Sequence, residues 1–405
     1  MKPRSLEEDL REVGVLVCAG TGGVGKTTIA AALAIQAAKL GRRTLVLTID
    51  PARRLADALG LDTLDSVPTR VDLSRPGLEE SGPRPIHLDA MMLDPKPTFD
   101  RLITRLARDD AERERILGNR IYQHLSSALA GSAEYAAMEQ VYEQVHSGEH
   151  DLIIVDTPPS DHALDFLRTP RRLREFLDSR FVQALVRPAM SASRLGFRLF
   201  GRPLHRMLGL LERIAGVGFL DDLSEFLSAI DGLSEGFQER AARVEEILLG
   251  PDTGFVLISA AHAGSQRTTI EFMRELAHFD VPLIALIVNR LRPWPLATSP
   301  ADQLRHCSAA TRDADHARLV RAFRDSTGPA GAPRDPDRLM AAVLETVRIC
   351  DAEQRIVETL ATTVADAGIP CLRVPELPGH VDRIDGLLEI GSALLAPVKP
   401  RVEDP

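Results

Sequence analysis

The feature that most constrains this chain is a glycine-rich loop, GTGGVGKT, at residues 20–27. It fits the pattern GxxxxGK[ST], and it stands between an apolar run at 13–20 and a helical pattern at 26–40. Glycines at these places let backbone N–H groups curve around phosphate oxygens, and the start of the helix adds a partial positive charge. The sequence therefore predicts a strand, a phosphate-binding loop and a helix, in that order.

The loop predicts a site for a nucleoside triphosphate together with Mg²⁺. Lys26 is expected to bridge the β- and γ-phosphates, and Thr27 is expected to ligate Mg²⁺. The predicted nucleotide-binding residues of the loop are Gly20, Thr21, Gly22, Gly23, Val24, Gly25, Lys26, Thr27 and Thr28. The alternative, a glycine-rich turn without a ligand, is disfavoured by the full match and its context.

Short apolar runs recur along the chain and indicate strands that are covered on both faces. They lie at 43–50, 151–158, 254–260, 281–290 and 369–374, with a weaker candidate at 84–93. Helical patterns, such as 266–277 and 381–396, lie between or after them. This alternation predicts an α/β fold with a doubly wound, mostly parallel sheet.

Two stretches, 98–147 and 169–250, show helical patterns without strands between them, and Thr98 or Asp100 is the expected N-cap of the first. The predicted division is a discontinuous core of 13–97, 148–168 and 251–400 with a helical insertion of those two stretches. Residues 180–217 carry seven arginines among many large apolar side chains. They line a groove for a hydrophobic helix, pack against the core or, as a third reading, bind an anionic membrane surface, since basic amphipathic patterning fits all three.

Two aspartates follow predicted strands directly. Asp50 ends the run at 43–50, and Asp156 lies near the end of the run at 151–158. Because the carboxyl ends of parallel strands face the same crevice, both carboxylates are expected near the phosphates. Asp156 suits a direct or outer-sphere role toward Mg²⁺, and Asp50 could orient or deprotonate the attacking water. The alternative for Asp50 is a turn or cap residue before Pro51.

The composition excludes several other classes of protein. A net charge of −9 disfavours nucleic-acid binding, and the longest apolar run has seven residues, too few for a transmembrane segment. The four cysteines form no CxxC pair, which disfavours a structural zinc site. Apart from His162, which is considered below, the histidines are not paired at metal-site spacing and are expected to be ordinary surface residues. The N-terminus has no apolar signal region, so a cytoplasmic protein is predicted.

Four linked motifs together resemble the arsenite-pump and tail-anchored-protein-targeting ATPase family. They are GGVGKTT at 22–28, LTIDPARRLADALG at 47–60, VDTPPSDHALDFL at 155–167 and IVNRL at 287–291. The resemblance covers the α/β core, and the helical stretches match in position only. It implies an ATPase that uses ATP and Mg²⁺, and a dimer whose nucleotide state controls helical insertions that hold a hydrophobic client.

The resemblance also assigns roles to single residues. Asp50 matches the acid that activates water, and Asn289 matches the residue that reads the adenine ring. The loop at 374–379, which contains Pro375, matches the segment that closes over the base. In the switch that senses the γ-phosphate, the matching residues are Asp156, Thr157, Pro158 and His162.

One departure from the family bears on the mechanism. Thr21 stands where relatives have a lysine that crosses the dimer interface to the partner's nucleotide. A chain without this lysine can receive one but cannot supply one, so a heterodimer with a paralogous P-loop ATPase is predicted in preference to a homodimer. The alternative is a nucleotide-binding regulatory subunit with little turnover of its own. The chromosome- and septum-positioning ATPases are a third reading, disfavoured by the long helical insertion, and metalloid transport is disfavoured because the cysteines form no cluster.

Overall fold

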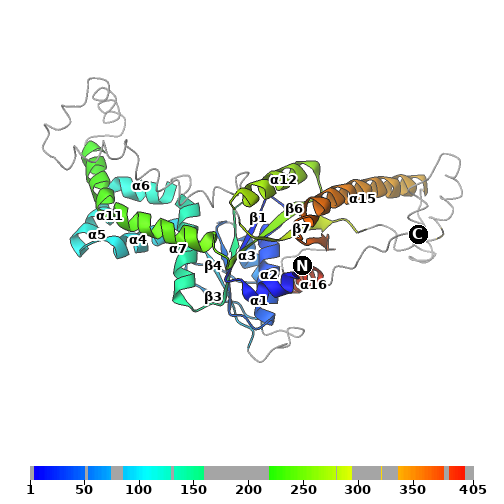
Figure 1. The fold of residues 1–405 in the computed structure, drawn as a ribbon, viewed down its shortest axis with the longest axis horizontal. Helices are drawn as coiled ribbons and strands as arrows, with labels where there is room; N and C mark the ends of the chain where they lie inside the picture. Colours follow the sequence, from blue (N-terminus) through cyan, green and yellow to red (C-terminus); the bar gives the residue numbers. More distant parts are fainter. Residues whose placement is uncertain are drawn as a thin grey trace, which may run out of the picture.

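The structure is a computed structural model of the 405-residue chain. It describes residues 4–50, 53–73, 85–128, 132–158, 219–279, 281–293, 321, 336–377 and 383–396. An eight-stranded sheet lies at its centre, helices cover both faces of the sheet, and a further group of helices lies to one side (Figure 1). This arrangement confirms the predicted α/β fold.

The sheet has the strand order β3-β4-β2-β5-β1-β6-β7-β8. Its strands are β1 (Val15–Gly20), β2 (Thr44–Thr48), β3 (Thr69–Arg70), β4 (Leu88–Met92), β5 (Leu152–Asp156), β6 (Thr253–Ala260), β7 (Leu283–Leu291) and β8 (Cys371–Pro375). All neighbouring pairs are parallel except β3 with β4. The seven predicted strands are all present, whereas the two-residue β3 was not predicted, because so short a strand has no periodicity to read.

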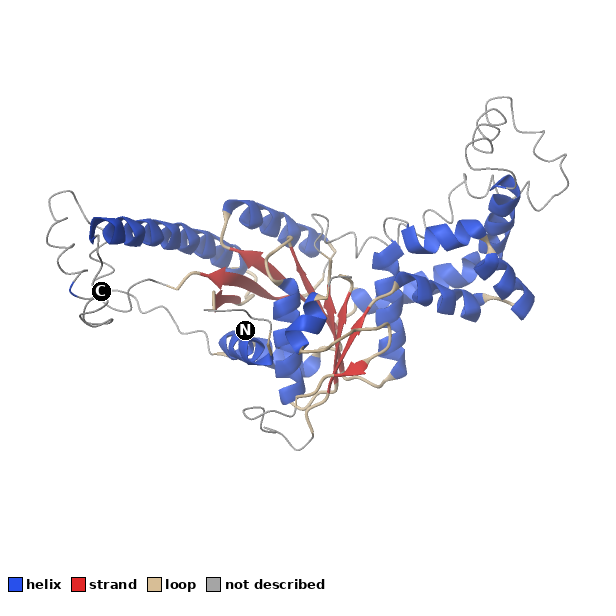
Figure 2. Cartoon of the chain, turned by 180° about the vertical axis from the view of Figure 1, so that it is seen from behind, coloured by secondary structure: helices blue, strands red, loops and turns tan. Residues whose placement is uncertain are grey.

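Successive residues of each strand enter different cores, as the two-residue period of a strand requires. Leu16 and Cys18 pack under α1 (Leu6–Glu12), α2 (Lys26–Lys39), α3 (Arg54–Leu59) and α16 (Ile384–Leu395). Val15 and Val17 face the opposite layer, which contains α7 (Ser132–Ser147), α12 (Ala263–His278), α15 (Pro336–Ala365) and the end of α11 (Phe219–Leu248) (Figure 2). Helices therefore exclude water from both faces of the sheet, which explains why the strands are apolar along their whole length.

A second, smaller core holds the helices beside the sheet together. Helices α4 (Pro95–Leu106), α5 (Asp110–Gly118) and α6 (Arg120–Ala128) pack there with α7 and α11. Its buried members are Leu102, Ile103, Ile116, Tyr122, Tyr135, Leu233, Phe237 and Ala241. Helix α7 joins the two regions. Its Tyr135 belongs to this smaller core, whereas its Met138 belongs to the core that contains Val15 and Val17 on one face of the sheet.

The start of α4 differs from the prediction. The N-cap is Asp94, whose side chain accepts a hydrogen bond from the backbone N–H of Lys96, and Pro95 occupies the first turn. Thr98, one of the two expected caps, is buried, and its hydroxyl donates to the carbonyl of Asp94. The Asp-Pro pair at 94–95 is the sequence signal that would have located this start.

Three other sequence features can be compared with the structure. The arginine-rich stretch at 180–217 lies outside the described residues. Helix α15 was not predicted as an element of its own. No helix among the described residues is long and apolar enough to cross a bilayer.

Candidate functional site

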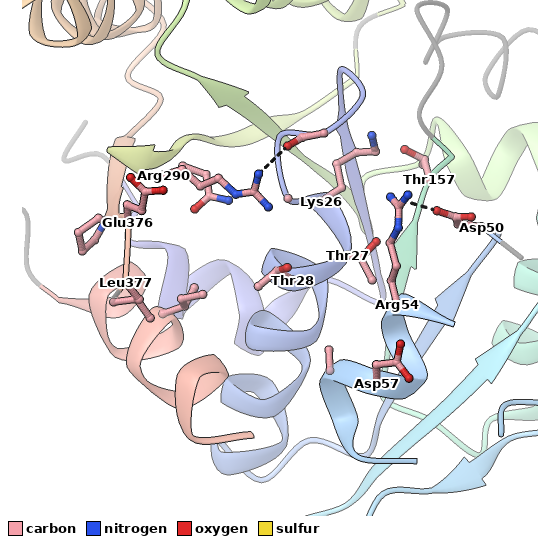
Figure 3. Close-up of a pocket in the computed structure, with 16 residues that line it drawn as sticks. Lys26, Thr27, Thr28, Asp50, Arg54, Asp57, Thr157, Arg290, Glu376 and Leu377 are labelled. Atoms are coloured by element: carbon pink, nitrogen blue, oxygen red, sulfur yellow. Dashed lines mark hydrogen bonds and ion pairs between the residues drawn. The ribbon is translucent and has the colours of Figure 1, made fainter. Parts of the chain in front are cut away.

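A cavity of about 680 Å³ lies at the carboxyl edge of the sheet, where β1 and its neighbours end (Figure 3). Its size falls within the range of small-molecule sites, about 300–1,000 Å³. The lining residues are Gly23, Gly25, Lys26, Thr27, Thr28, Asp50, Arg54, Asp57, Ala58, Thr157, Asn289, Arg290, Pro375, Glu376, Leu377 and Ile390. Because β2, β5 and β1 are adjacent and parallel, residues far apart in sequence meet here.

The loop between β1 and α2 has the backbone that its glycines predict. Gly25 is the N-cap of α2 with φ 91°, and no side chain caps the helix. A Cβ at this position would overlap the amide nitrogen of Asn289, so only glycine fits. The N–H groups of the first helical turn therefore have no side-chain cap and are available to an anionic ligand.

Lys26 is buried in this loop, with only 6% of its surface exposed. Its Nζ donates hydrogen bonds to the carbonyls of Gly20 and Thr21, both at 3.0 Å. Burial lowers the pKa of the amine, while the nearby carboxylates of Asp156 and Asp50 act in the opposite direction. A phosphate group would supply the negative charge that compensates this desolvated ammonium.

Asp156 ends β5 beneath the loop and is fully buried. Its Oδ2 accepts hydrogen bonds from the hydroxyls of Thr27 (2.8 Å) and Thr48 (2.9 Å). Burial raises the pKa of the carboxyl to about 6, although these two hydrogen bonds and Lys26 act to lower it. Its Oδ1 has no hydrogen-bond partner among the described residues.

The donor set at Asp156 fits Mg²⁺. A carboxylate and a threonine hydroxyl are hard oxygen ligands, which this ion prefers, and Thr27 also lines the cavity. A buried carboxylate with one oxygen left unpartnered is costly to ionise, and a divalent cation would remove that cost. Thr27 and Asp156 therefore form one polar cluster.

Asp50 lies just beyond the end of β2, with 15% of its side chain exposed. Its carboxylate pairs with the guanidinium of Arg54 one helical turn later, at 3.6 Å. Its backbone N–H donates to the hydroxyl of Thr48, which in turn donates to Asp156. Thr48, the last residue of β2, thus connects the two aspartates, a role that sequence reasoning missed because the residue belongs to the apolar run at 43–50.

The far wall of the cavity comes from the ends of β7 and β8. The amide nitrogen of Asn289 donates to the carbonyl of Val24 (2.8 Å), and Arg290 donates to the carbonyl of Gly23 (3.1 Å). Arg290 holds a left-handed backbone with φ 57°, an unusual conformation for a side chain of this size. The Asn289 amide keeps its oxygen and a second N–H for a ligand.

Thr21 does not line the cavity. Its hydroxyl lies 3.3 Å from that of Ser265, which is 3.1 Å from Ser259, and Thr269 donates to Ser259 at 2.8 Å. These hydroxyls connect the loop to β6 and α12 of the same chain. Thr21 therefore contacts its own chain at the position where the family places a lysine.

The structure brings most of the predicted site residues to the cavity. Gly23, Gly25, Lys26, Thr27, Thr28, Asp50, Thr157, Asn289 and Pro375 line it. Gly20, Thr21, Gly22, Val24, Asp156 and Pro158 do not, and His162 lies outside the described residues.

Sequence reasoning missed three charged residues of the lining, Arg54, Asp57 and Arg290. All three fall within motifs that were recognised, since Arg54 and Asp57 follow Asp50 and Arg290 follows Asn289. Arg54 and Asp57 stand one and two helical turns after Asp50, and Arg290 directly follows Asn289. These spacings were the sequence signal that could have placed the three residues near the site.

The remaining histidines were predicted to be ordinary surface residues, and this was wrong for His150. The structure buries its side chain to 2% exposure at the start of β5, at the sheet edge opposite the cavity. It pairs there with Asp89 of β4.

Comparison with known proteins gives consistent matches over this region. Residues 13–313 match the family described as anion-transporting ATPase. A protein of Aspergillus terreus named ATPase get3 is 30% identical over 288 residues, covering 70% of this chain and 74% of that protein. A Malassezia globosa protein named ATPase GET3 is 25% identical over 299 residues, covering 74% of this chain and 78% of that protein.

Proposed function

The chain belongs to the anion-transporting ATPase family and is an ATP hydrolase, and from this premise we propose that it is a Mg²⁺-dependent ATPase whose nucleotide state switches a dimer. The observation that supports this best is the cluster of Lys26, Thr27 and Asp156 beneath the phosphate-binding loop, with Asp50 across the cavity. The proposed place of action is the cytoplasm.

In the proposed reaction, water attacks the γ-phosphorus of ATP, and the bond from that phosphorus to the departing ADP breaks. The loop N–H groups and Lys26 hold the phosphate oxygens where negative charge collects in the transition state. Thr27 with Asp156 would hold Mg²⁺, which neutralises phosphate charge when it is bound. Asp50 accepts a hydrogen bond from the attacking water and orients it, and Asn289 with Pro375 forms the base end of the cavity.

Asp50→Asn tests the water-orienting role. The variant should bind a fluorescent ATP analogue as the wild type does and lose turnover by about 100-fold or more, because only the group that orients the water is changed. Asp62→Asn, an exposed aspartate outside the cavity, is the matched control and should hydrolyse ATP normally. Unchanged hydrolysis in Asp50→Asn would remove Asp50 from the mechanism.

The helices beside the sheet are the proposed client-binding part of the molecule. The proposed division assigns them to a helical insertion of 98–147 and 169–250 within a core of 13–97, 148–168 and 251–400, of which residues 169–218 lie outside the described residues. Helix α7 contributes side chains both to the core of this helical region and to the core on one face of the sheet. A movement at the sheet would therefore be transmitted through α7 to the helical region. The proposed client is a hydrophobic helical segment like that of a tail-anchored membrane protein, which the GET3-named relatives support.

Client binding can be measured with a transmembrane peptide carried on a soluble fusion protein. Co-elution of this fusion with the chain should depend on whether ATP, ADP or no nucleotide is present. A polar helix on the same carrier is the control. Absence of co-elution in every nucleotide state would contradict the client role.

The position of Thr21 supports a heterodimer with a paralogous P-loop ATPase that carries the missing lysine. Its hydroxyl is engaged with Ser265, and a threonine side chain is too short to reach a partner's nucleotide. The pure chain should therefore turn over slowly, and Thr21→Lys should raise its turnover by supplying the cation within a homodimer. Sedimentation and ATPase assays test this, and brisk cooperative hydrolysis by the unmodified homodimer would contradict it. Slow turnover in both proteins would favour a regulatory nucleotide-binding subunit.

A further inference from the structure

A cluster of two histidines and a carboxylate lies at the amino edge of the sheet, opposite the nucleotide cavity. His87 directly precedes β4, Asp89 lies within β4, and His150 precedes β5. Both strands pair with β2, since Thr44 is opposite Leu88 on one side and Leu152 on the other. The parallel register therefore brings together two histidines that are 63 positions apart in the sequence.

The three side chains converge on one carboxylate oxygen. Nε2 of His87 and Nε2 of His150 each lie 2.9 Å from Oδ2 of Asp89, and one ligand atom from each residue falls within 4.8 Å of the others. The exposed fraction of the side chain is 2% for His150, 12% for Asp89 and 28% for His87. The cluster is therefore buried on the His150 side and reaches solvent beside His87.

The hydrogen bonds within this cluster cannot all be satisfied by protons. Arg70 of β3 lies 2.9 Å from Nε2 of His87, and a guanidinium can only donate, so that nitrogen must present its lone pair. The 2.9 Å contact between this nitrogen and Asp89 then joins two acceptors. If the nitrogen carried a proton instead, the contact with Arg70 would join two donors.

A metal cation resolves this conflict, because it accepts lone pairs from all three groups. We propose that His87, Asp89 and His150 bind one transition-metal ion of the Zn²⁺ class, with water at the fourth position beside His87. Imidazole and carboxylate are preferred ligands of such ions, and Zn²⁺ bonds of about 2.0–2.1 Å place tetrahedral ligand atoms about 3.3 Å apart. The two histidine–carboxylate spacings of 2.9 Å need to open by only a few tenths of an ångström, and the ligand atoms of the two histidines lie within 4.8 Å of each other.

Arg70 is the competitor of the metal in this site. Its guanidinium pairs with Asp89 at 2.7 Å and contacts His87, so in the metal-free protein it supplies positive charge. Its side chain is 56% exposed and lies on the two-residue edge strand β3, which leaves it room to turn away. The metal would then link the starts of β4 and β5, beside the turn that leaves α7.

Titration of the metal-stripped full chain with Co²⁺, followed by the visible absorption bands of tetrahedral Co²⁺, tests this assignment. Zn²⁺ is then added to displace the Co²⁺ signal. One equivalent should bind, and His87→Gln and His150→Gln should each weaken binding by at least about 100-fold. His146→Gln changes an exposed histidine near the end of α7 and should bind Co²⁺ as the wild type does.

Arg70→Gln separates metal binding from a purely structural cluster. Removing a cation that contacts two of the ligands should tighten Co²⁺ binding by roughly tenfold. Should His150→Gln fail to fold, the more exposed His87→Gln carries the same test, with circular dichroism as the folding control. Absence of the tetrahedral spectrum in the wild type would overturn the proposal. So would undiminished binding in His87→Gln, or weaker binding in a folded Arg70→Gln.

Discussion

The replacement Asp156→Asn gives a sharp test of the site because the stability effect should change sign with pH. In the metal-free protein the carboxyl is fully buried, and burial raises its pKa from 3.8 to about 6. A folded-state pKa above the unfolded one means that the neutral acid is favoured in the fold. The stability from this group is therefore fully present below about pH 4 and is lost as the pH rises through about 6.

The magnitude follows from the difference between about 6 and 3.8, at about 1.4 kcal/mol for each pH unit. The wild type should lose about 3 kcal/mol from this group between pH 4 and pH 8, and the asparagine variant should not. Asparagine can keep the hydrogen bonds from Thr27 and Thr48 through its oxygen, but it places an amide nitrogen where Oδ1 has no partner. That unpartnered amide costs about 1 kcal/mol. The variant should be more stable by about 2 kcal/mol at pH 8 and less stable by about 1 kcal/mol at pH 4.

Urea unfolding with EDTA at both pH values measures these differences. Added Mg²⁺ and ATP should then stabilise the wild type much more than the variant, because the variant has lost the anionic oxygens. Asp151→Asn is a contrasting control at the other end of β5, since its hydrogen bond with Arg43 lowers the pKa of Asp151 to about 2. Stability from Asp151 is present above about pH 4 and is lost only as the pH falls through about 2, so this variant should be destabilised by a similar amount at pH 8 and at pH 4. An equal loss of stability in Asp156→Asn at both pH values would refute the argument.

Two further substitutions test the loop and the helices. Gly25→Ala should abolish binding of a fluorescent ATP analogue, because the added Cβ overlaps the side chain of Asn289. The control Gly41→Ala has a similar φ of 85° but lies in open space, so it should lose about 1 kcal/mol of stability and bind the analogue normally. Normal binding in Gly25→Ala would contradict the loop geometry. Arg240→Ala leaves the fully buried Glu139 without its partner at 2.7 Å and should cost about 3–5 kcal/mol in urea unfolding at pH 8. The loss should shrink toward pH 5, because burial raises the pKa of Glu139 and lets it take up a proton. The exposed Arg243→Ala is the control, and equal losses in the two variants would contradict a buried ion pair.

The sequence by itself determined the strands, the loop and the edge at which the site forms. Runs such as 151–158 predicted buried parallel strands, because a strand covered on both faces must be apolar along its length. Once Gly20, Asp50 and Asp156 were placed at strand ends, the common direction of parallel strands was enough to bring them together. The predicted start of α4 was wrong, because Asp94, and not Thr98 or Asp100, is the N-cap of this helix.

Only the tertiary structure decided which side chains touch. The link from Asp50 through Thr48 to Asp156, and the contact of Thr21 with Ser265, depend on distances that no local pattern records. The same holds for His87 and His150, which looked like isolated histidines in the sequence. Strand order β4-β2-β5 placed them on either side of one strand. The local sequence pattern determines the type and period of each element. The pairing of distant strands determines which charged groups and lone pairs lie close together in a buried site.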